Sequence, residues 1–230
     1  MNYFADAMIA AVNLLLQFDP EICLIIWTSL KIALIATSIA ASFAIPIGIF
    51  IAINHFFGKR LLLQLLNTLM AMPTVMIGLI FFGLLSRRGL FGDFGLLYTE
   101  TSVIIGEASL ILPIIINMTV VAVQSADSRL LPTLKSLGAT QAQLIMPLLK
   151  ELRYVLLAAV ITGFGRAIGE VGAAMMLGGN IHGTTRTMTT AIALETSKGD
   201  FELGLALGLV LLIIAFSVNF ILQQLSPEST

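Results

Sequence analysis

Long apolar runs, separated by short polar segments, dominate the pattern along this chain. A helix rises about 1.5 Å per residue, so about 20 apolar residues cross about 30 Å of hydrocarbon. Five runs reach that length, and each predicts a membrane-spanning helix: 32–53, 61–85, 102–123, 155–177 and 203–222. Spans tolerate internal prolines where neighbouring groups satisfy the freed backbone, as required here at Pro46, Pro73 and Pro113. The pattern predicts one all-α transmembrane bundle, residues 1–230.

The N-terminal segment, residues 1–21, has a shorter apolar stretch with a polar stripe. Asn2, Asp6, Asn13 and Gln17 recur at spacings of 4, 7 and 4, so they share one face of a helix. This favours an amphipathic helix over 3–18 that lies in the membrane interface, with a sixth span as the alternative. Acidic residues stand where a secretory signal peptide has its basic start, so we expect the segment to be retained.

The polar connections differ in length and in charge. Those at 54–60 and 86–101 are short, 124–154 is a long polar excursion, and 178–202 is a hydroxyl-rich loop with a predicted helix over 188–196. The first and third connections share one side of the membrane and carry six basic residues, against four on the other side. The positive-inside rule therefore favours an outside N-terminus, a cytoplasmic excursion and an inside C-terminus.

The cytoplasmic excursion has its own internal pattern. Helical periodicity runs from 128 to 153 and is interrupted by Pro132, Gly138 and Pro147. This predicts two short helices that meet at a turn containing Gly138. A helical protrusion from a small membrane bundle indicates a contact with a partner.

Composition narrows the class of function. The chain is 58% hydrophobic and 11% charged, whereas soluble domains carry about 25% charged residues. A net charge of -1 gives no reason to expect nucleic-acid binding. Cys23 is the single cysteine, which excludes an internal disulfide.

The sequence also lacks the common chemical motifs. It contains no GxxxxGK[ST], HExxH, CxxC or GxSxG, so we expect no phosphate-binding loop, no metal site, no bound cofactor and no catalytic residues. His55 and His182 lie in connections on opposite sides of the membrane, which also argues against a metal site.

Two full charges stand inside the fourth predicted span. Arg166 and Glu170 are four residues apart, so they share a helix face and can pair. Thr162 and Ala174 extend their ridge. A neighbouring ridge of small residues would admit another helix: Gly165, Gly169 and Ala173. Charges inside spans mark solute pathways by default, so we predict a polar lining here. The alternative is an ion pair that only fixes helix packing.

Glu107 raises the same question in the third predicted span. It lies about one turn into that span, close to the expected outer surface. We expect its carboxylate to reach the outer interface, where water solvates it. A place on the solute pathway is the alternative.

Several segments carry a resemblance to a known family. "SLGAT" in the excursion, "GFGRAIGEVGAAMMLGGNIHG" in the fourth span and "TRTMTTAIALETSKGDF" after it are similar to the permease subunits of bacterial and archaeal ABC importers for oxyanions. The likeness is closest to the tungstate branch, because molybdate permeases read nearer to "RALGEFGAT" in the fourth span. It covers almost the whole chain.

This resemblance implies a homodimer with one central pathway. Two separate ATP-binding cassette subunits would bind its cytoplasmic face, holding ATP and Mg, and an extracytoplasmic binding protein would deliver the oxyanion. Such permeases carry EAAxxxG and a later Pro in the excursion. In this sequence the motif glycine is Gly138. The three EAA positions are occupied by Pro132, Thr133 and Leu134, and the position of the later Pro is occupied by Glu151.

The family mechanism assigns roles to residues of this chain. The coupling segment that contacts the ATPase would comprise Ser136, Leu137, Gly138, Ala139, Thr140 and Gln141. The translocation path would be lined by Arg166, Glu170, Thr162 and Asn180, and an outer vestibule by Thr185 and Thr189. A dianion cannot enter hydrocarbon, and inward movement costs about 2.3 kcal/mol per charge per 100 mV. A partner must therefore supply the energy.

Alternatives remain open at this point. The same machine could carry molybdate or another oxyanion, since these ions share shape and charge. An ion-coupled secondary transporter would be expected to show internal repeats, which the sequence does not display. A membrane enzyme would need a nucleophile with its base, or a metal site, and neither pattern is present.

Overall fold

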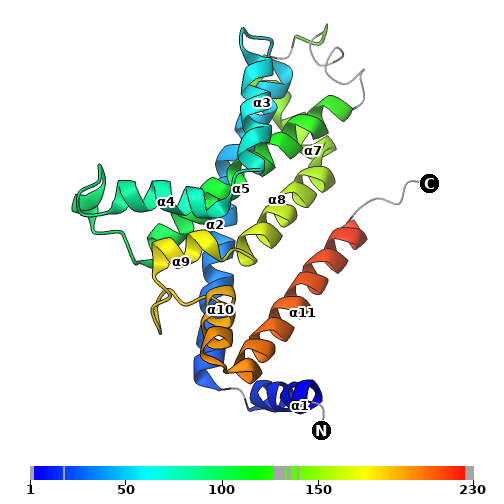
Figure 1. The fold of residues 1–230 in the computed structure, drawn as a ribbon. Coiled ribbons are helices and arrows are strands. Elements are labelled where there is room, and N and C mark those ends of the chain that lie inside the picture. The colour runs from blue at the N-terminus through cyan, green and yellow to red at the C-terminus, as the bar shows by residue number, and fades with distance from the viewer. Residues whose placement is uncertain (1–2, 18, 127–132, 134–135, 139, 226–230) are drawn as a thin grey trace.

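The computed structural model describes residues 3–17, 19–126, 133, 136–138 and 140–225, and every regular element in them is helical (Figure 1). Three helices are long and apolar enough to cross a membrane. They are α2 (Pro20–Ile53), α5 (Glu100–Ser125) and α11 (Phe201–Leu225). The all-α prediction is confirmed for these residues.

The first span begins earlier than the sequence pattern predicts. Pro20 occupies the first turn of α2, and the Asp19 carboxylate accepts the backbone N–H of Glu21 at 2.7 Å. Proline and an N-cap aspartate both favour a helix start, because the first N–H groups have no partner within the helix. As a result α2 is 34 residues long, and Trp27 and Lys31 lie within it.

Two predicted spans are bent rather than straight. α3 (Lys59–Met70) and α4 (Thr74–Leu85) meet at 99°, with Pro73 at the start of α4. α8 (Arg153–Ile168) and α9 (Gly172–Gly178) meet at 61°. The expectation of continuous helices was therefore wrong. The count reaches five spans only when each bent pair is taken as one.

The remaining elements lie in the connections. They are the 3-10 turn η1 (Gly92–Phe94), α7 (Gln141–Glu151) and α10 (Met188–Lys198). α10 confirms the helix predicted over 188–196. Of the two helices predicted to meet at Gly138, α7 is present, and most of the other falls outside the described residues.

Small residues let α2 and α5 pack closely at the centre of the bundle. Gly48 of α2 lies against Thr119 of α5, and a buried stripe of α2 is made of alanines: Ala33, Ala36, Ala40 and Ala44. α8 also reaches α5, where Gly163 contacts Ile115. Across the α3–α5 contact, Asn117 donates to the side-chain oxygen of Asn67 at 2.6 Å.

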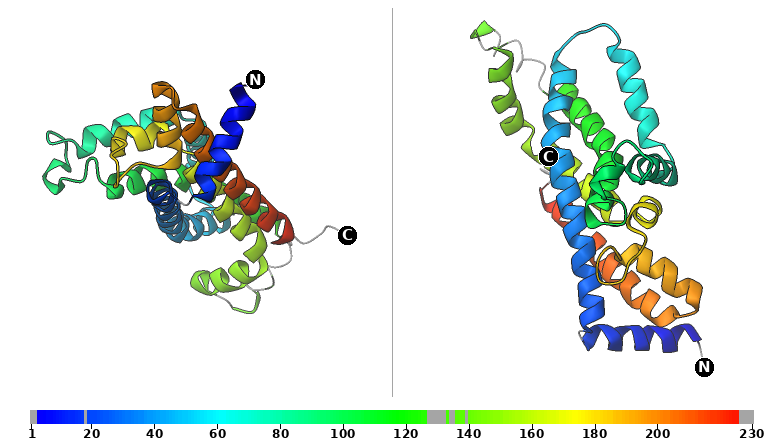
Figure 2. Two further views of the ribbon diagram at one scale, coloured as in Figure 1. Left: turned by 90° about the horizontal axis from the view of Figure 1, so that it is seen from below. Right: turned by 90° about the vertical axis from the view of Figure 1, so that its left-hand side faces the viewer.

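The helix α1 (Tyr3–Leu16) lies across the foot of α2, as Figures 1 and 2 both show. It packs against α11, with Ala7 and Ala11 buried in the contact. The crosswise orientation agrees with an interfacial helix rather than a sixth span. Its placement at a membrane surface stays a prediction.

The two ends of the bundle carry different connections. The end of α2, the start of α3 and α7 gather at the top of Figure 1, whereas α1, α10 and the start of α11 gather at the bottom. This agrees with the prediction that the connections 54–60 and 124–154 lie on the same side of the bundle. Which end faces the cytoplasm stays a prediction.

The α2–α5 contact has a direct test in Gly48→Ala. A Cβ at Gly48 would lie 2.7 Å from Cβ of Thr119, so the helices must separate, at about 1 to 3 kcal/mol. We expect a lower unfolding temperature for the purified protein in detergent. Gly208→Ala in α11 is the matched control, because a Cβ there meets open space, and it should leave that temperature unchanged or higher. Equal shifts in both variants would refute the packing assignment.

Candidate functional site

The break between α8 and α9 is held by hydrogen bonds to its freed backbone groups. The carbonyl oxygen of Glu170 accepts the Thr189 hydroxyl at 2.6 Å, and the N–H of Glu170 donates to the carbonyl of Ala167 at 3.0 Å. At the far end of α9, the Leu177 carbonyl accepts from the Ser102 hydroxyl at 2.9 Å. Backbone groups that leave a helix inside a bundle need such partners.

Arg166 and Glu170 form the predicted ion pair at this break. Arg166 Nη1 lies 2.7 Å from Glu170 Oε2, while Glu170 Oε1 accepts the backbone N–H of Ala173 at 3.0 Å. The carboxylate therefore pairs with the guanidinium and also caps α9. Glu170 is only 3% exposed, whereas the Arg166 side chain is 38% exposed. The anionic member is fixed, and the cationic member can reach solvent or a solute.

The break also changes the predicted ridges. Because α8 ends at Ile168, the ridge does not continue from Thr162 through Glu170 to Ala174. Thr162 and Gly165 line a groove toward α11, and Ala174 is buried in the core. A Cβ at Gly165 would meet open space, so none of the described helices packs closely there. The predicted close approach at Gly165 was wrong within this chain.

The second bent span brings its own break to the same place. A Cβ at Gly172, the first residue of α9, would lie 3.0 Å from the Thr74 hydroxyl at the start of α4. Further along, Gly78 of α4 lies against Cα of Ala173. The two short helices thus begin side by side and run in the same direction in Figure 1. Their starts and the Arg166–Glu170 pair form one site, which we call the break junction: Thr74, Val75, Arg166, Glu170 and Gly172.

Glu107 does not reach an outer interface, and that expectation was wrong. It is 3% exposed, within α5, and its Oε2 has no hydrogen-bond partner among the described residues. The charges of Glu170 and Arg166 act on it. α5 begins at Glu100, so the residue lies two turns inside the helix rather than one. The longer helix explains its burial.

The predicted vestibule threonines are buried. The Thr185 hydroxyl donates to the Gly178 carbonyl at 2.5 Å and accepts the N–H of Ile181 at 3.0 Å. Thr189 is bonded to Glu170, as described above. Both hydroxyls therefore support backbone at the end of α9 and at the break. A vestibule role stays a prediction that none of these contacts supports.

Asn180 lies two residues beyond the end of α9 and has a left-handed backbone, with φ of 51°. Its Nδ2 donates to the Thr190 carbonyl at 3.4 Å, which links the loop to α10. A place on the translocation path stays a prediction for this residue.

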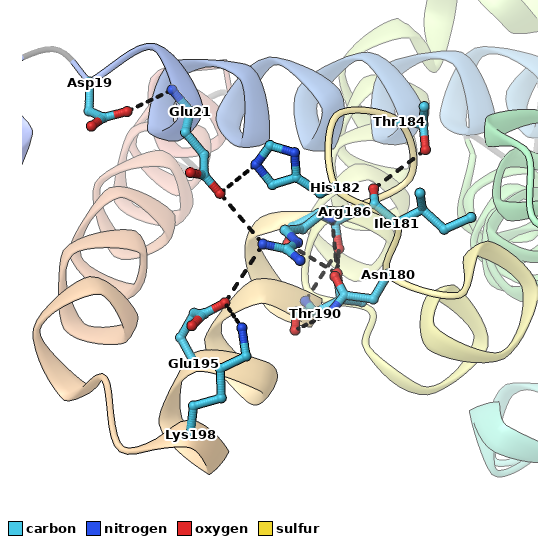
Figure 3. A network of polar contacts seen from close by, with 11 residues as sticks. Asp19, Glu21, Asn180, Ile181, His182, Thr184, Arg186, Thr190, Glu195 and Lys198 are labelled. Atoms are coloured by element: carbon cyan, nitrogen blue, oxygen red, sulfur yellow. Dashed lines mark hydrogen bonds and ion pairs between the residues drawn. The ribbon is translucent and has the colours of Figure 1, made fainter.

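A charged network between the start of α2, the loop that follows α9, and α10 was not predicted from the sequence. Figure 3 shows Arg186 between Glu21 at the start of α2 and Glu195 of α10, at 3.5 and 3.7 Å. His182 Nε2 lies 2.7 Å from Glu21, and Lys198 Nζ lies 3.0 Å from Glu195. Glu21 lies far in sequence from the other members, and the set follows no common motif, so only the fold brings them together.

The predicted coupling segment forms an exposed turn. Gly138 has φ of 82°, a left-handed conformation that favours glycine, and Leu137 before it is 78% exposed. The Ser136 hydroxyl donates to the Thr133 carbonyl, and the N–H of Thr140 donates to the Gln143 side chain ahead of α7. Gln141 begins α7, and Ala139 lies outside the described residues. Contact with an ATPase stays a prediction.

The described residues contain no group of three or more His, Cys, Asp or Glu side chains that could hold a metal ion. The break junction instead offers one guanidinium, partly exposed, to an anionic group. Arg166 can donate to an oxyanion through N–H groups that Glu170 does not use.

Comparison with known proteins adds a family model and close relatives. The model described as binding-protein-dependent transport system inner membrane component matches residues 44–229. The tungstate uptake system permease protein TupB of Peptoclostridium acidaminophilum is 43% identical over 228 residues, covering 99% of this chain and 100% of the relative. TupB of Campylobacter jejuni is 38% identical over 98% of this chain and 94% of its own.

More distant matches include a sequence relative and a solved structure. The molybdenum transport system permease protein ModB of Escherichia coli is 26% identical over 91% of this chain and 96% of its own. Among solved structures, an amino acid ABC transporter with histidines superposes with a TM-score of 0.64 at 16% identity, over 91% of this chain and 94% of that one. At that identity the structural likeness shows the fold alone.

The double role of Glu170 predicts a graded loss of stability. Glu170→Ala removes the cap on α9 and leaves Arg166 unpaired, whereas Glu170→Gln keeps an oxygen for the Ala173 N–H. We expect losses of about 2 to 3 kcal/mol and about 1 kcal/mol respectively, because a lost cap and an unmade charged bond each cost about 1 kcal/mol or more. Unfolding temperatures in detergent measure the order. Glu202→Ala, at an exposed position of α11, is the control, and equal losses for Ala and Gln would contradict the capping role.

Proposed function

The chain belongs to the family of binding-protein-dependent transport system inner membrane components, and on that premise we propose that it is the permease subunit of a tungstate importer. The observation that carries the proposal is its relation to two tungstate uptake permeases over nearly the whole of both chains. The break junction supports it, because a partly exposed arginine inside a membrane bundle suits a tetrahedral dianion.

Other subunits would complete the importer. We propose a homodimer with one central path, two ATP-binding cassette subunits, and an extracytoplasmic binding protein of the kind that the family description implies. Exposed apolar side chains follow α3 and α4 on the surface of the single chain, and a second copy or lipid would cover them: Leu61, Leu65, Leu69, Val75, Leu79 and Ile80. The whole would sit in the cytoplasmic membrane, with the N-terminus outside.

The proposed path passes Arg166. A tungstate dianion that leaves the binding protein needs positive potential inside the low-dielectric bundle, and one guanidinium supplies it. The start of α4 lies at the same junction, and the N-terminal end of a helix adds partial positive charge. Glu170 limits how tightly Arg166 holds the anion, because the carboxylate competes for the same N–H groups. Weak, reversible capture is what transport requires.

The proposed energy source acts through the turn at Gly138. An exposed leucine on a glycine turn, ahead of α7, whose Leu144 and Leu148 share a buried cluster with Leu156 of α8, suits a rigid contact element. Movement of α7 would reach α8 directly, and α8 carries Arg166 at its last turn. This chain of contacts links the partner surface to the break junction.

Arg166→Gln tests the path. We expect ATP-dependent uptake of radiolabelled tungstate, by vesicles holding the full complex with its binding protein, to fall at least tenfold, because the path loses its positive charge. Arg60→Gln, which removes an exposed arginine away from the junction, should retain uptake. Unchanged uptake in assembled Arg166→Gln complexes would leave Arg166 a packing role. Preferential uptake of molybdate by the unaltered complex would assign a different oxyanion.

Leu137→Asp tests the coupling turn. We expect the amount of ATPase subunit that co-purifies with the chain to fall about tenfold, since a buried apolar anchor at an interface contributes 1.4 kcal/mol or more. Leu90→Asp is the matched control, because Leu90 is an equally exposed leucine in the connection after α4. Full co-purification of both variants would place the contact elsewhere.

A further inference from the structure

Glu107 is a buried carboxylate that has no role in the proposed path as described above. It is almost fully enclosed within α5, and its Oε2 has no hydrogen-bond partner in the part of the chain that the structure describes. Buried ionisable groups are otherwise paired or hydrogen-bonded, because an unmade bond to a charged group is costly. A carboxylate in this position needs a reason.

The neighbours of Glu107 on α5 place it opposite the α8–α9 break. Gly106 packs against Leu177 in the last turn of α9, and Ile111, one turn further along, packs against Gly163 of α8. Glu107 lies between these two contacts, so it faces the stretch that contains the break. The charges of Glu170 and Arg166 both act on it, as expected from that position.

The hydrogen bonds at the junction decide which group could serve Glu107. Both oxygens of Glu170 are engaged, one by Arg166 and one by the backbone of Ala173. Arg166 uses Nη1 for Glu170, and a guanidinium has five N–H donors. Arg166 is therefore a cation with donors to spare at the break that Glu107 faces.

The three side chains also differ in freedom. Glu170 is held by burial and by its bond to α9, whereas Arg166 is partly exposed on a long stem. If the pair opens, Arg166 moves and Glu170 stays. Glu107, on the face of α5 opposite the break, then offers an oxygen that has no partner among the described residues.

We propose that Glu107 is a positioning residue for Arg166, the second carboxylate that receives the guanidinium when its pair with Glu170 opens. The exchange gives Arg166 two defined positions beside the path. It keeps the charge from leaving the junction when an anion or a change of conformation separates the first pair. This role rests on the proposed function, in which Arg166 meets the anion.

A stability cycle tests the exchange without any substrate. In the unaltered protein Glu107→Gln should leave the unfolding temperature unchanged or raise it, because Arg166 is held by Glu170. In the Glu170→Gln background Arg166 depends on Glu107, so adding Glu107→Gln should lower that temperature by about 2 to 4 °C. Ser109→Ala, whose hydroxyl bonds within α5 to the Ile105 carbonyl, should shift both backgrounds equally. The same shift for Glu107→Gln in both backgrounds would overturn the proposal.

Transport gives a second, independent readout. Glu107→Gln should lower the maximal rate of tungstate uptake by about fivefold or more, and Glu107→Asp should restore part of it. In the Arg166→Gln background, adding Glu107→Gln should slow uptake no further, because its partner is already gone. If the double variant instead loses uptake by the product of the two single-variant losses, Glu107 acts independently of Arg166, and the positioning role is overturned. If the unaltered complex takes up no tungstate, the proposed function fails, while the stability cycle still decides whether Glu107 receives Arg166.

Discussion

Every backbone N–H and C=O freed inside a lipid-embedded bundle must find a partner within the protein, and this constraint organises the structure. The two bent spans free such groups at the centre of the chain. At the break between α8 and α9, the Glu170 carboxylate accepts a backbone N–H and the Thr189 hydroxyl donates to a backbone carbonyl. In the last turn of α9, the Ser102 hydroxyl donates to a backbone carbonyl. Some of the residues that look chemically active in the sequence therefore use hydrogen bonds to hold the backbone.

The same constraint links the break junction to the loop between α9 and α10. Thr189 lies in the first turn of α10 and holds the break directly, while Thr185 holds the end of α9. The N–H of Met188 in turn donates to the Ser29 hydroxyl of α2 at 2.6 Å. The loop is thus fastened to the break, to α9 and to α2, and Arg186 adds ion pairs to Glu21 and Glu195. On the proposed path, a solute that crosses the junction would pass this loop.

Hydrophobic periodicity located the apolar segments in their order, because burial in lipid demands about 20 apolar residues whatever the tertiary packing. Three of these segments are single long helices, and the count reaches five only when each bent pair is one span. It could not predict the breaks. Gly169 and Gly172 permit either a close helix contact or an interruption, and only the surrounding partners decide between them. The Arg166–Glu170 pair followed from spacing alone, since its members lie close in sequence. The burial of Glu107 did not, because it depends on where α5 begins and on which helix faces it.

The asymmetry of the ion pair indicates which residue can act. A carboxylate that caps a helix and is shielded from solvent cannot change partners without disrupting α9, so its charge is part of the scaffold. A guanidinium with spare donors and partial exposure can exchange one anionic partner for another at little structural cost. Because Arg166 stands in the last turn of α8, which α7 contacts, and Glu170 lies beyond the end of α8, a small displacement of α8 would change the distance between them. On the proposed function, the junction would thus convert a mechanical displacement of α8 into a change in the positive charge available to an anion.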